Sequence, residues 1–261
     1  MIRIKNGIGV YFAAVLAFVL LGYALGGGTP RSLFAAPFSS EAFLGTDGRG
    51  FSMVRVSLKV FAFSFSHALV AAFLASLLGA GLATVAQYSR RFSEALGRLV
   101  DAFQSFPSFI ALIVIDGLIF RGGSWALVFA FAFTQWAEAY RVVDAYFAAE
   151  LSNSYVVASR ALGATRTRVL QDLLRTSWRS VWFPLAVDQV SAFLLLETVA
   201  GFFGLPTGEW SVGTMFLSLR SHPTAYWLVV PPAALLFSGL FPLRLTSDKL
   251  RNRVYLRDPR S

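Results

Sequence analysis

The sequence contains no cysteine and only two histidines, His67 and His222, among its 261 residues. Without cysteine there can be no disulfide framework, no thiolate metal site and no cysteine nucleophile. Two histidines are too few for a histidine-built metal centre. Charge is also scarce, since charged residues make up 14% of the chain, whereas a soluble domain averages about 25%. The chain is therefore short of the surface that water requires.

A nucleotide-binding signature is absent as well. The sequence has no Gly-x-x-x-x-Gly-Lys-Ser/Thr loop, and no glycine-rich segment follows a strand-like pattern. If the protein's function consumes ATP, another subunit must bind the nucleotide. We expect this chain to carry no catalytic residue, no metal and no cofactor of its own. The net charge of +9 does not indicate nucleic acid, because the basic residues lie in short segments between apolar runs and not on one solvated face.

Apolar runs are what the sequence has in abundance, with 56% hydrophobic residues and 26 Phe. A helix needs roughly 20 apolar residues to cross a bilayer core. Six stretches are long enough, at 8–27, 57–86, 99–120, 124–142, 181–203 and 226–243. The sequence therefore predicts an all-α, polytopic membrane protein with about six transmembrane helices in contact with lipid. A short turn at 121–124 would join the third and fourth into an antiparallel hairpin, and the first is read as a retained helix.

The distribution of Lys and Arg predicts the orientation. Seventeen of the 23 lie in the segments 1–7, 87–98, 141–180 and 244–261, which would all face the same side. Cytoplasmic segments carry the excess of positive charge. Both termini are therefore predicted to be cytoplasmic. We expect an N-terminal region at 1–56, with one helix and an external segment, followed by a core domain at 57–261.

The longest predicted cytoplasmic segment, 141–180, is too polar to span and too helix-prone to be a slack linker. It predicts two short helices, one ending near Leu162 and one starting near Thr165, with Gly163 at the left-handed junction. One apolar face is expected from Ala158, Ala161, Val169 and Leu170, with Arg160, Arg166 and Arg168 on the other side. The segment could dock into a groove on a partner. It could equally be an interfacial helix pair that packs on its own bundle.

Within this segment, the run YVVASRALGATRTRVL at 155–170 resembles the coupling loop of binding-protein-dependent ABC importer permeases of the dipeptide/oligopeptide/nickel group. That loop carries Glu-Ala-Ala, with Gly four residues after the second Ala, and Ala158 and Gly163 match it. Val157 stands at the Glu position and Ser159 at the second Ala, while Arg-Thr at 175–176 replaces a Leu-Pro pair. The helical form should survive these changes, but the polar contact of the Glu is missing.

Five further segments resemble the same family in the same order. They are FLGTDGRG at 43–50, LVDAFQSFPSFIALIVI at 99–115, TQWAEAYRVV at 134–143, LLLETVAGFFGLPTGEWSVGTM at 194–215 and SDKLRNRVYLRDPR at 247–260. Each is short and degenerate, but their order and spacing make the match specific. The resemblance covers nearly the whole chain.

The resemblance implies a type I ABC importer permease fold in the inner membrane of a bacterial cell. The chain would form half of a pore with a second, homologous permease subunit. Two ABC ATPases carrying ATP and Mg would dock on the coupling loops, and an extracytoplasmic substrate-binding protein would deliver peptides or related solutes near 29–56 and 204–225. The residues expected to contact the ATPase are Ser154, Tyr155, Ala158, Arg160, Leu162 and Gly163.

Ionisable residues inside spans are costly in lipid and are expected to face protein or water. Asp188 and Glu197 lie nine residues apart on the fifth expected helix, so they point to roughly opposite sides. They are candidates for the pore or the contact with the second permease. The alternative is a buried hydrogen bond between helices. Gly79 and Gly81 could likewise allow close helix contact, or could be neutral filler.

Two other functions compete with the importer permease. A secondary transporter would show inverted internal repeats, and none is visible. A membrane-embedded enzyme would need a nucleophile with a base or a metal cluster. His67 has Ser64 and Ser66 beside it, but no motif supports such a site, and a lone histidine within a span is more often structural.

Overall fold

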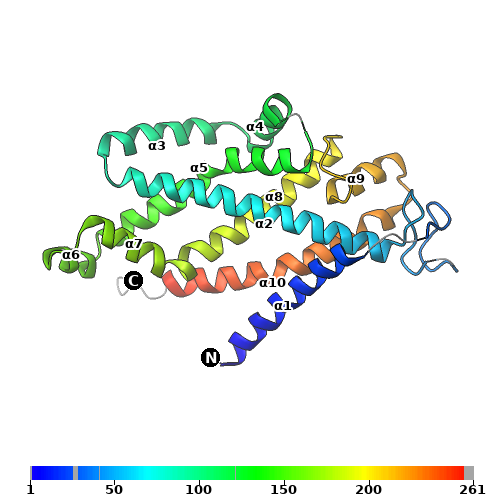
Figure 1. Cartoon of the computed structure of the whole chain (residues 1–261), viewed down its shortest axis with the longest axis horizontal. Helices are drawn as coiled ribbons and strands as arrows, with labels where there is room; N and C mark the ends of the chain where they lie inside the picture. Colours follow the sequence, from blue (N-terminus) through cyan, green and yellow to red (C-terminus); the bar gives the residue numbers. More distant parts are fainter. Residues whose placement is uncertain (1, 26–28, 41, 121, 256–261) are drawn as a thin grey trace. The chain divides into compact units, whose positions relative to one another are not determined.

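The computed structural model describes residues 2–25, 29–40, 42–120 and 122–255, and most of the chain in these ranges is helical, apart from the loops before Met53 and before Val212 (Figure 1). No strand occurs within them, and the all-α prediction is confirmed. An isolated antiparallel bridge joins Thr46 to Ser52. Arg121 of the expected turn and the end of the matched C-terminal tail lie outside the described residues.

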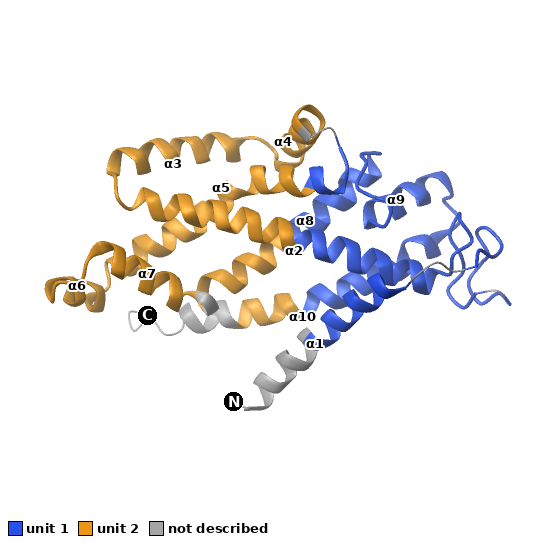
Figure 2. Ribbon diagram, viewed as in Figure 1, with its two compact units in different colours: residues 1–69, 120–127, 191–242 blue, residues 70–119, 128–190, 243–261 orange. Residues whose placement is uncertain are grey.

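The chain divides into two compact units (Figure 2), which are described separately below. One comprises residues 1–69, 120–127 and 191–242, and the other comprises 70–119, 128–190 and 243–261. The division falls within four long helices, namely α2 (Met53–Ala86), α5 (Ser124–Leu151), α8 (Phe183–Phe202) and α10 (Val230–Tyr255). The sequence instead predicted an N-terminal region at 1–56 and a core domain at 57–261, and this division stays a prediction.

The first unit also contains α1 (Ile2–Ala24) and α9 (Val212–Ser221), with a 3-10 turn at Tyr226–Leu228. Small residues bring its helices together. A Cβ at Gly201 of α8 would overlap the backbone of Gly213 in α9, so these helices meet backbone to backbone. On α2, the rings of Phe61 and Phe65 are stacked with their centroids 5.2 Å apart and are buried.

The second unit contains α3 (Arg90–Ser105), α4 (Ser108–Ile115), α6 (Ser154–Ala161) and α7 (Arg166–Thr176). Two π-helical segments, Asp116–Phe120 and Trp178–Trp182, precede α5 and α8. A Cβ at Gly79 of α2 would lie 2.5 Å from the Trp136 carbonyl oxygen and from the Tyr140 nitrogen, whereas one at Gly81 would meet nothing within 4 Å. The close helix contact considered for these glycines therefore exists at Gly79 of α2 against α5, and Gly81 is neutral.

Three described helical segments are long and apolar enough to cross a membrane: Met53–Ala86, Ser180–Phe202 and Tyr226–Lys249. A fourth span is possible if α3 and α4 form one broken span. The apolar part of α1, Ala13–Ala24, is shorter. The 28-residue α5 is not among the candidates, because Gln135, Glu138 and Arg141 interrupt its apolar stretch. The first and fourth of the six expected spans therefore stay predictions.

The third expected span, a continuous helix over 99–120, is wrong in form. α3 begins at Arg90 and ends at Ser105, and the chain turns by 93° before α4. Pro107 causes the break, because the residue before a proline is driven out of the helical region. Phe106 accordingly has φ −89° and ψ 138°. α4 with its π-helical extension rises only about 20 Å, too short to cross a bilayer alone.

Candidate functional site

The segment 141–180 of the second unit folds as the end of α5, then α6, α7 and a π-helical segment. The prediction of two short helices, one ending near Leu162 and one starting near Thr165, is confirmed. Thr165 caps α7, since its hydroxyl accepts the Arg168 N–H at 3.4 Å. α6 and α7 are in contact with each other.

Gly163 makes the junction between α6 and α7 possible. Its φ of +94° is in the left-handed region that favours glycine. The Ala164 N–H donates to the Ser159 carbonyl at 3.1 Å, and the Gly163 N–H donates to the Arg160 carbonyl at 3.0 Å. These two bonds form a Schellman motif, which satisfies the last carbonyls of α6. The direction of the chain after α6 is therefore fixed by backbone hydrogen bonds.

The helix pair is anchored by a buried apolar cluster. Val156 of α6 and Val169, Leu170 and Leu173 of α7 are buried in it together with Phe147 of α5. The Tyr146 hydroxyl adds a hydrogen bond of 3.3 Å to the Leu173 carbonyl. The helix pair is thus a rigid extension of the second unit.

The predicted apolar face is half right. Val169 and Leu170 are buried, as expected, but Ala158 and Ala161 are exposed. Val156 takes their place against the rest of the unit. The side of α6 that carries the two alanines faces outward.

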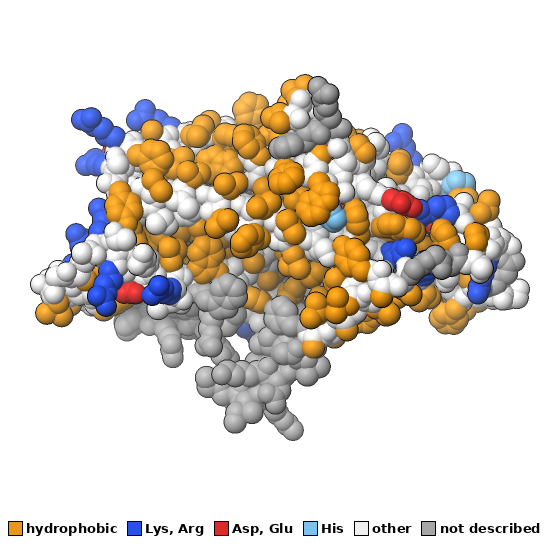
Figure 3. All heavy atoms as spheres, viewed as in Figure 1, with side chains coloured by type: hydrophobic (Ala, Val, Ile, Leu, Met, Phe, Trp, Pro, Cys, Tyr) orange, Lys and Arg blue, Asp and Glu red, His pale blue; other side chains and the backbone are white. Residues whose placement is uncertain are grey.

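All six residues predicted to contact an ATPase are exposed, at the start of α6, along it or at its junction with α7. Leu162 is 90% exposed, Tyr155 is 58% exposed, and Val157, at the family's Glu position, is 57% exposed. Exposed apolar side chains on a short, well-anchored helix form a surface suited to a partner. The remaining four, also exposed, are Ser154, Ala158, Arg160 and Gly163. Figure 3 shows further Lys and Arg side chains gathered around α6 and α7 and near the start of α3.

Sequence reasoning missed Glu150, at the end of α5. One oxygen of its carboxylate accepts the Tyr155 hydroxyl at 2.5 Å and the Asn153 amide at 2.9 Å. Burial, followed by this hydrogen bond, raises the pKa of Tyr155 above its ordinary value. A carboxylate therefore fixes the start of α6, although the Glu expected within the helix is absent. The signal available was a Glu five residues before a Tyr at a helix boundary.

A second polar contact holds the end of α2 to α5. The Gln87 side-chain amide donates to the Asp144 carboxylate at 2.9 Å. Burial raises the pKa of Asp144, and the hydrogen bond from Gln87 offsets part of that rise. The carboxyl group is thus held in a site that favours its protonated form.

The two ionisable residues of α8 have different surroundings. Asp188 pairs with Arg244 of α10 at 3.6 Å. Glu197 is 1% exposed and hydrogen-bonded to Ser64 of α2, while its Oε2 has no hydrogen-bond partner among the described residues. For Glu197 the geometry supports the buried interhelical hydrogen bond. A role in the pore or at a subunit contact stays a prediction for both residues.

His67 is a structural histidine. Its Nδ1 donates to the Phe63 carbonyl at 2.8 Å, and its ring lies against those of Phe63 and Trp125. The Ser64 hydroxyl accepts the N–H of Val212. Among the described residues, no group of three or more His, Asp or Glu side chains could hold a metal ion.

In the first unit, the FLGTDGRG segment folds into a loop held by its own polar side chains. The Thr46 hydroxyl accepts the Ala35 N–H at 2.7 Å and donates to the Ser32 carbonyl at 2.6 Å. Gly45 and Gly50 have φ of +82° and +80°, which explains both glycines. The motif that carried the family resemblance therefore encodes a specific turn.

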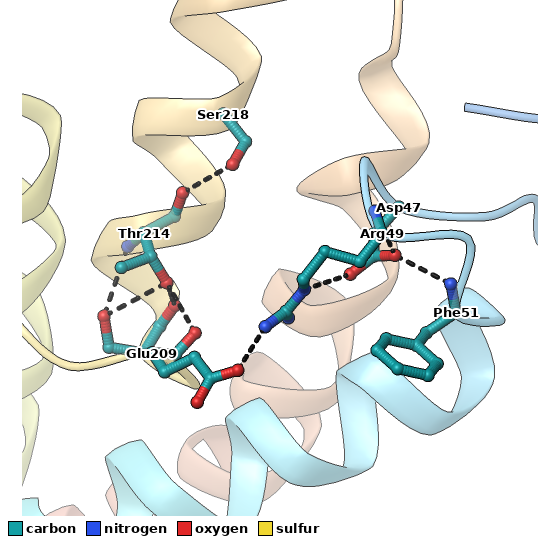
Figure 4. Close-up of polar contacts among 7 residues, drawn as sticks. Asp47, Arg49, Phe51, Glu209, Thr214 and Ser218 are labelled. Atoms are coloured by element: carbon teal, nitrogen blue, oxygen red, sulfur yellow. Dashed lines mark hydrogen bonds and ion pairs between the residues drawn. The ribbon is translucent and has the colours of Figure 1, made fainter. Parts of the chain in front are cut away.

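Asp47 and Arg49 connect this loop to the segment before α9 (Figure 4). The Asp47 carboxylate accepts the backbone N–H groups of Arg49 at 3.0 Å and Phe51 at 2.8 Å, and pairs with the Arg49 guanidinium at 3.1 Å. Arg49 also pairs with Glu209 and lies 4.2 Å from the ring centroid of Trp210. The predicted external segments 29–56 and 204–225 are thus tied together by one arginine that sequence reasoning did not identify.

Beside this arginine lies a cavity of about 390 Å³. Its polar lining includes Asp47, Arg49, Glu209, Thr214, Ser218 and His222. The Thr214 and Ser218 hydroxyls donate to backbone carbonyls. The polar groups of the cavity are therefore largely satisfied within the unit.

These features define a class: a helical membrane protein with a rigid, exposed helix pair at the end of one unit. Comparison with known proteins narrows the class. Residues 73–248 match the family model described as binding-protein-dependent transport system inner membrane component. The chain belongs to this family, and it is a membrane permease subunit.

Relatives support the assignment over most of the chain. The oligopeptide transport system permease protein OppC of Lactococcus lactis subsp. cremoris is 25% identical over 84% of this chain and 76% of its own. The di/tripeptide permease protein DppC of Pseudomonas aeruginosa is 27% identical over 81% of this chain and 71% of its own. The nickel permease protein NikC of Escherichia coli is 26% identical over 82% and 79%, respectively.

A solved structure is similar in fold. An inward-facing crystal structure of the MetNI methionine ABC transporter contains a chain that matches with a TM-score of 0.62 and 17% identity. The match covers 77% of this chain and 97% of the other. The predicted permease fold is confirmed.

Proposed function

We propose that this chain forms half of the translocation pore of an ATP-driven importer, with a second, homologous permease forming the other half. The outward side of α6 would dock on a cytoplasmic ATPase, and ATP and Mg would be bound there and not on this chain. The observation that carries the proposal is the exposed apolar surface of α6 on a rigidly anchored helix pair.

The anchoring suits the mechanical task. A coupling element must pass a rigid-body movement from one subunit to the next. The Schellman motif at Gly163 and the buried side chains of α7 would prevent α6 from absorbing that movement. The excess of Lys and Arg in the segments 87–98 and 141–180 supports a cytoplasmic position for this end of the second unit.

The transported solutes are proposed from the relatives. Permeases named for oligopeptides, di/tripeptides and nickel all align with this chain. We infer a peptide or a related small solute, delivered by an extracytoplasmic binding protein to the segments 29–56 and 204–225. The site of transport would be the inner membrane of a bacterial cell.

Leu162→Asp tests the docking surface. The side chain is 90% exposed, so the substitution should leave the thermal midpoint of the purified chain unchanged. Loss of a central apolar contact costs about 2 kcal/mol, or roughly 30-fold in affinity. Recovery of the ATPase with the tagged permease from detergent should fall accordingly.

Phe38→Asp is the matched control, because Phe38 is also a large exposed side chain, at 77%, and lies in a predicted external segment. It should leave ATPase recovery unchanged. Equal recovery with Leu162→Asp and the parent chain would reject α6 as the docking surface. Recovery of the parent chain without any ATPase would reject the importer.

A further inference from the structure

Two cations near the start of α2 have no carboxylate partner in the part of the chain that the structure describes. Arg55 and Lys59 lie one helical turn apart, and both are only partly exposed. Among the described residues, neither has a carboxylate oxygen within ion-pair distance, whereas Arg49 has two. The buried Nε of Arg55 has no hydrogen-bond partner in the described part of the chain. Basic residues in the first turns of a helix are also opposed by its macrodipole, so this pair favours binding of an anion.

Aromatic rings surround the pair. The Lys59 ammonium lies 4.5 Å from the ring centroid of Trp210, and the Arg55 guanidinium lies 5.2 Å from that of Phe51. Rings of this kind hold a cation in place by its attraction to the π face, but they do not neutralise its charge. The Arg55 guanidinium also donates to the Leu25 carbonyl at 3.5 Å. Neither this neutral acceptor nor the rings neutralise the two positive charges, which remain available to a ligand.

A cavity of about 170 Å³ opens beside Lys59. Its other walls are Gly22 and Tyr23 of α1, Ala62 and Phe63 of α2, and Trp210. The lining is apolar apart from the ammonium and the tyrosine. Next to it, α1 exposes Leu20 at 60% and Leu21 at 47%. The cavity therefore combines one lining cation, Lys59, with apolar walls that continue onto an exposed apolar helix, and Arg55 lies one helical turn before Lys59.

We propose that this cavity binds one anionic phospholipid, with the phosphate at Lys59 and Arg55 and the start of an acyl chain against Ala62 and Phe63. α2 is a candidate membrane span that starts at Met53, so its first turns lie where lipid headgroups are expected. Fixed cations at that level attract anionic lipid at about 1 kcal/mol per charge. A soluble anion would use the cations but gain little from the apolar walls. The proposal does not depend on the solute that the permease carries.

Native mass spectrometry of the full chain with its co-purifying partners tests the site. The protein is delipidated, then mixed with phosphatidylglycerol or with phosphatidylcholine, and the retained lipid is counted. The wild-type chain should retain one phosphatidylglycerol in preference to phosphatidylcholine. Lys59→Gln and Arg55→Gln should each weaken that retention roughly fivefold.

Arg220→Gln is the matched control, because Arg220 is an exposed cation of the same unit in the last turn of α9, outside the cavity lining. It should leave retention unchanged. The proposal would be overturned if all three variants lost the same amount of phosphatidylglycerol, or if the wild type retained the two lipids equally. Displacement of the lipid by inorganic phosphate or by a dipeptide would also overturn it, since the occupant would then be a water-soluble molecule and not a lipid. Monodispersity of each variant in detergent shows that it has folded.

Discussion

Replacement of Gly163 by alanine isolates the backbone geometry on which the α6–α7 junction depends. A Cβ at this position would meet no atom within 4 Å, so the substitution creates no clash. The φ of +94° remains, and the left-handed region costs an L-residue about 1–2 kcal/mol. The whole effect of Gly163→Ala should therefore come from backbone strain at the junction.

The strain has a local readout. The N–H groups of Gly163 and Ala164 donate the two hydrogen bonds of the motif, to Arg160 and Ser159. A local loss of 1–2 kcal/mol corresponds to a roughly 5- to 30-fold rise in the open population. Hydrogen exchange of a peptide covering 159–164, followed by mass spectrometry, should show these amides exchanging faster by that factor. Gly163→Asn should have a smaller effect, because Asn visits the left-handed region more readily.

Gly97 supplies the control, because it lies within α3 and a Cβ there also meets nothing within 4 Å. Gly97→Ala should leave exchange at 159–164 unchanged and should stabilise the protein by up to about 1 kcal/mol. If Gly163→Ala exchanges at the parental rate, the left-handed junction does not limit opening, and the argument for a rigid α6 is refuted.

Three further substitutions test other parts of the structure. Gly79→Ala should lower the free energy of unfolding by about 1–3 kcal/mol, because its Cβ meets the backbone of α5. Gly81→Ala should raise the free energy of unfolding slightly, because its Cβ meets nothing. Denaturant titration in detergent compares the two variants. Asp144→Asn keeps the acceptor for Gln87, and since burial raises the pKa of the acid, the parent loses stability as pH rises through that pKa. The variant should therefore have a higher melting temperature than the parent at pH 7, and this difference should disappear below about pH 4. A difference that does not change with pH would contradict the reasoning. Arg49→Gln should destabilise the first unit by about 1–3 kcal/mol, because it leaves a buried carboxylate without its cation, and a melting point equal to the parent's would exclude a structural role for the bridge.

The α6–α7 junction was predictable because its signals are local. Gly163 and Thr165 are recognisable as a helix terminus and a helix cap without knowledge of the remaining chain. The side of α6 that faces inward was not predictable. Its eight residues include one Val at the buried position and small alanines that fit either side. The contacts with α5 and α7 therefore determine which side of α6 is buried.

The remaining failures have equally specific causes. The apolar run at 99–120 suggested one helix, but Pro107 inside it imposes a local steric constraint that outweighs hydropathy. The Arg49–Glu209 ion pair joins residues 160 positions apart. No local pattern identifies such a pair, although the turn around Asp47 is encoded within a few residues.

The central claim is that the outward side of α6 binds an ATPase, and the absence of cysteine allows a direct measurement. Leu162→Cys places the chain's single thiol at a position that is 90% exposed. A short bifunctional crosslinker is added to the purified complex, and the products are identified by mass spectrometry. The account predicts a crosslink to an ATPase subunit from Leu162→Cys and none from Phe38→Cys. An ATPase crosslink from Phe38→Cys, or none from Leu162→Cys in a complex that contains the ATPase, would contradict it.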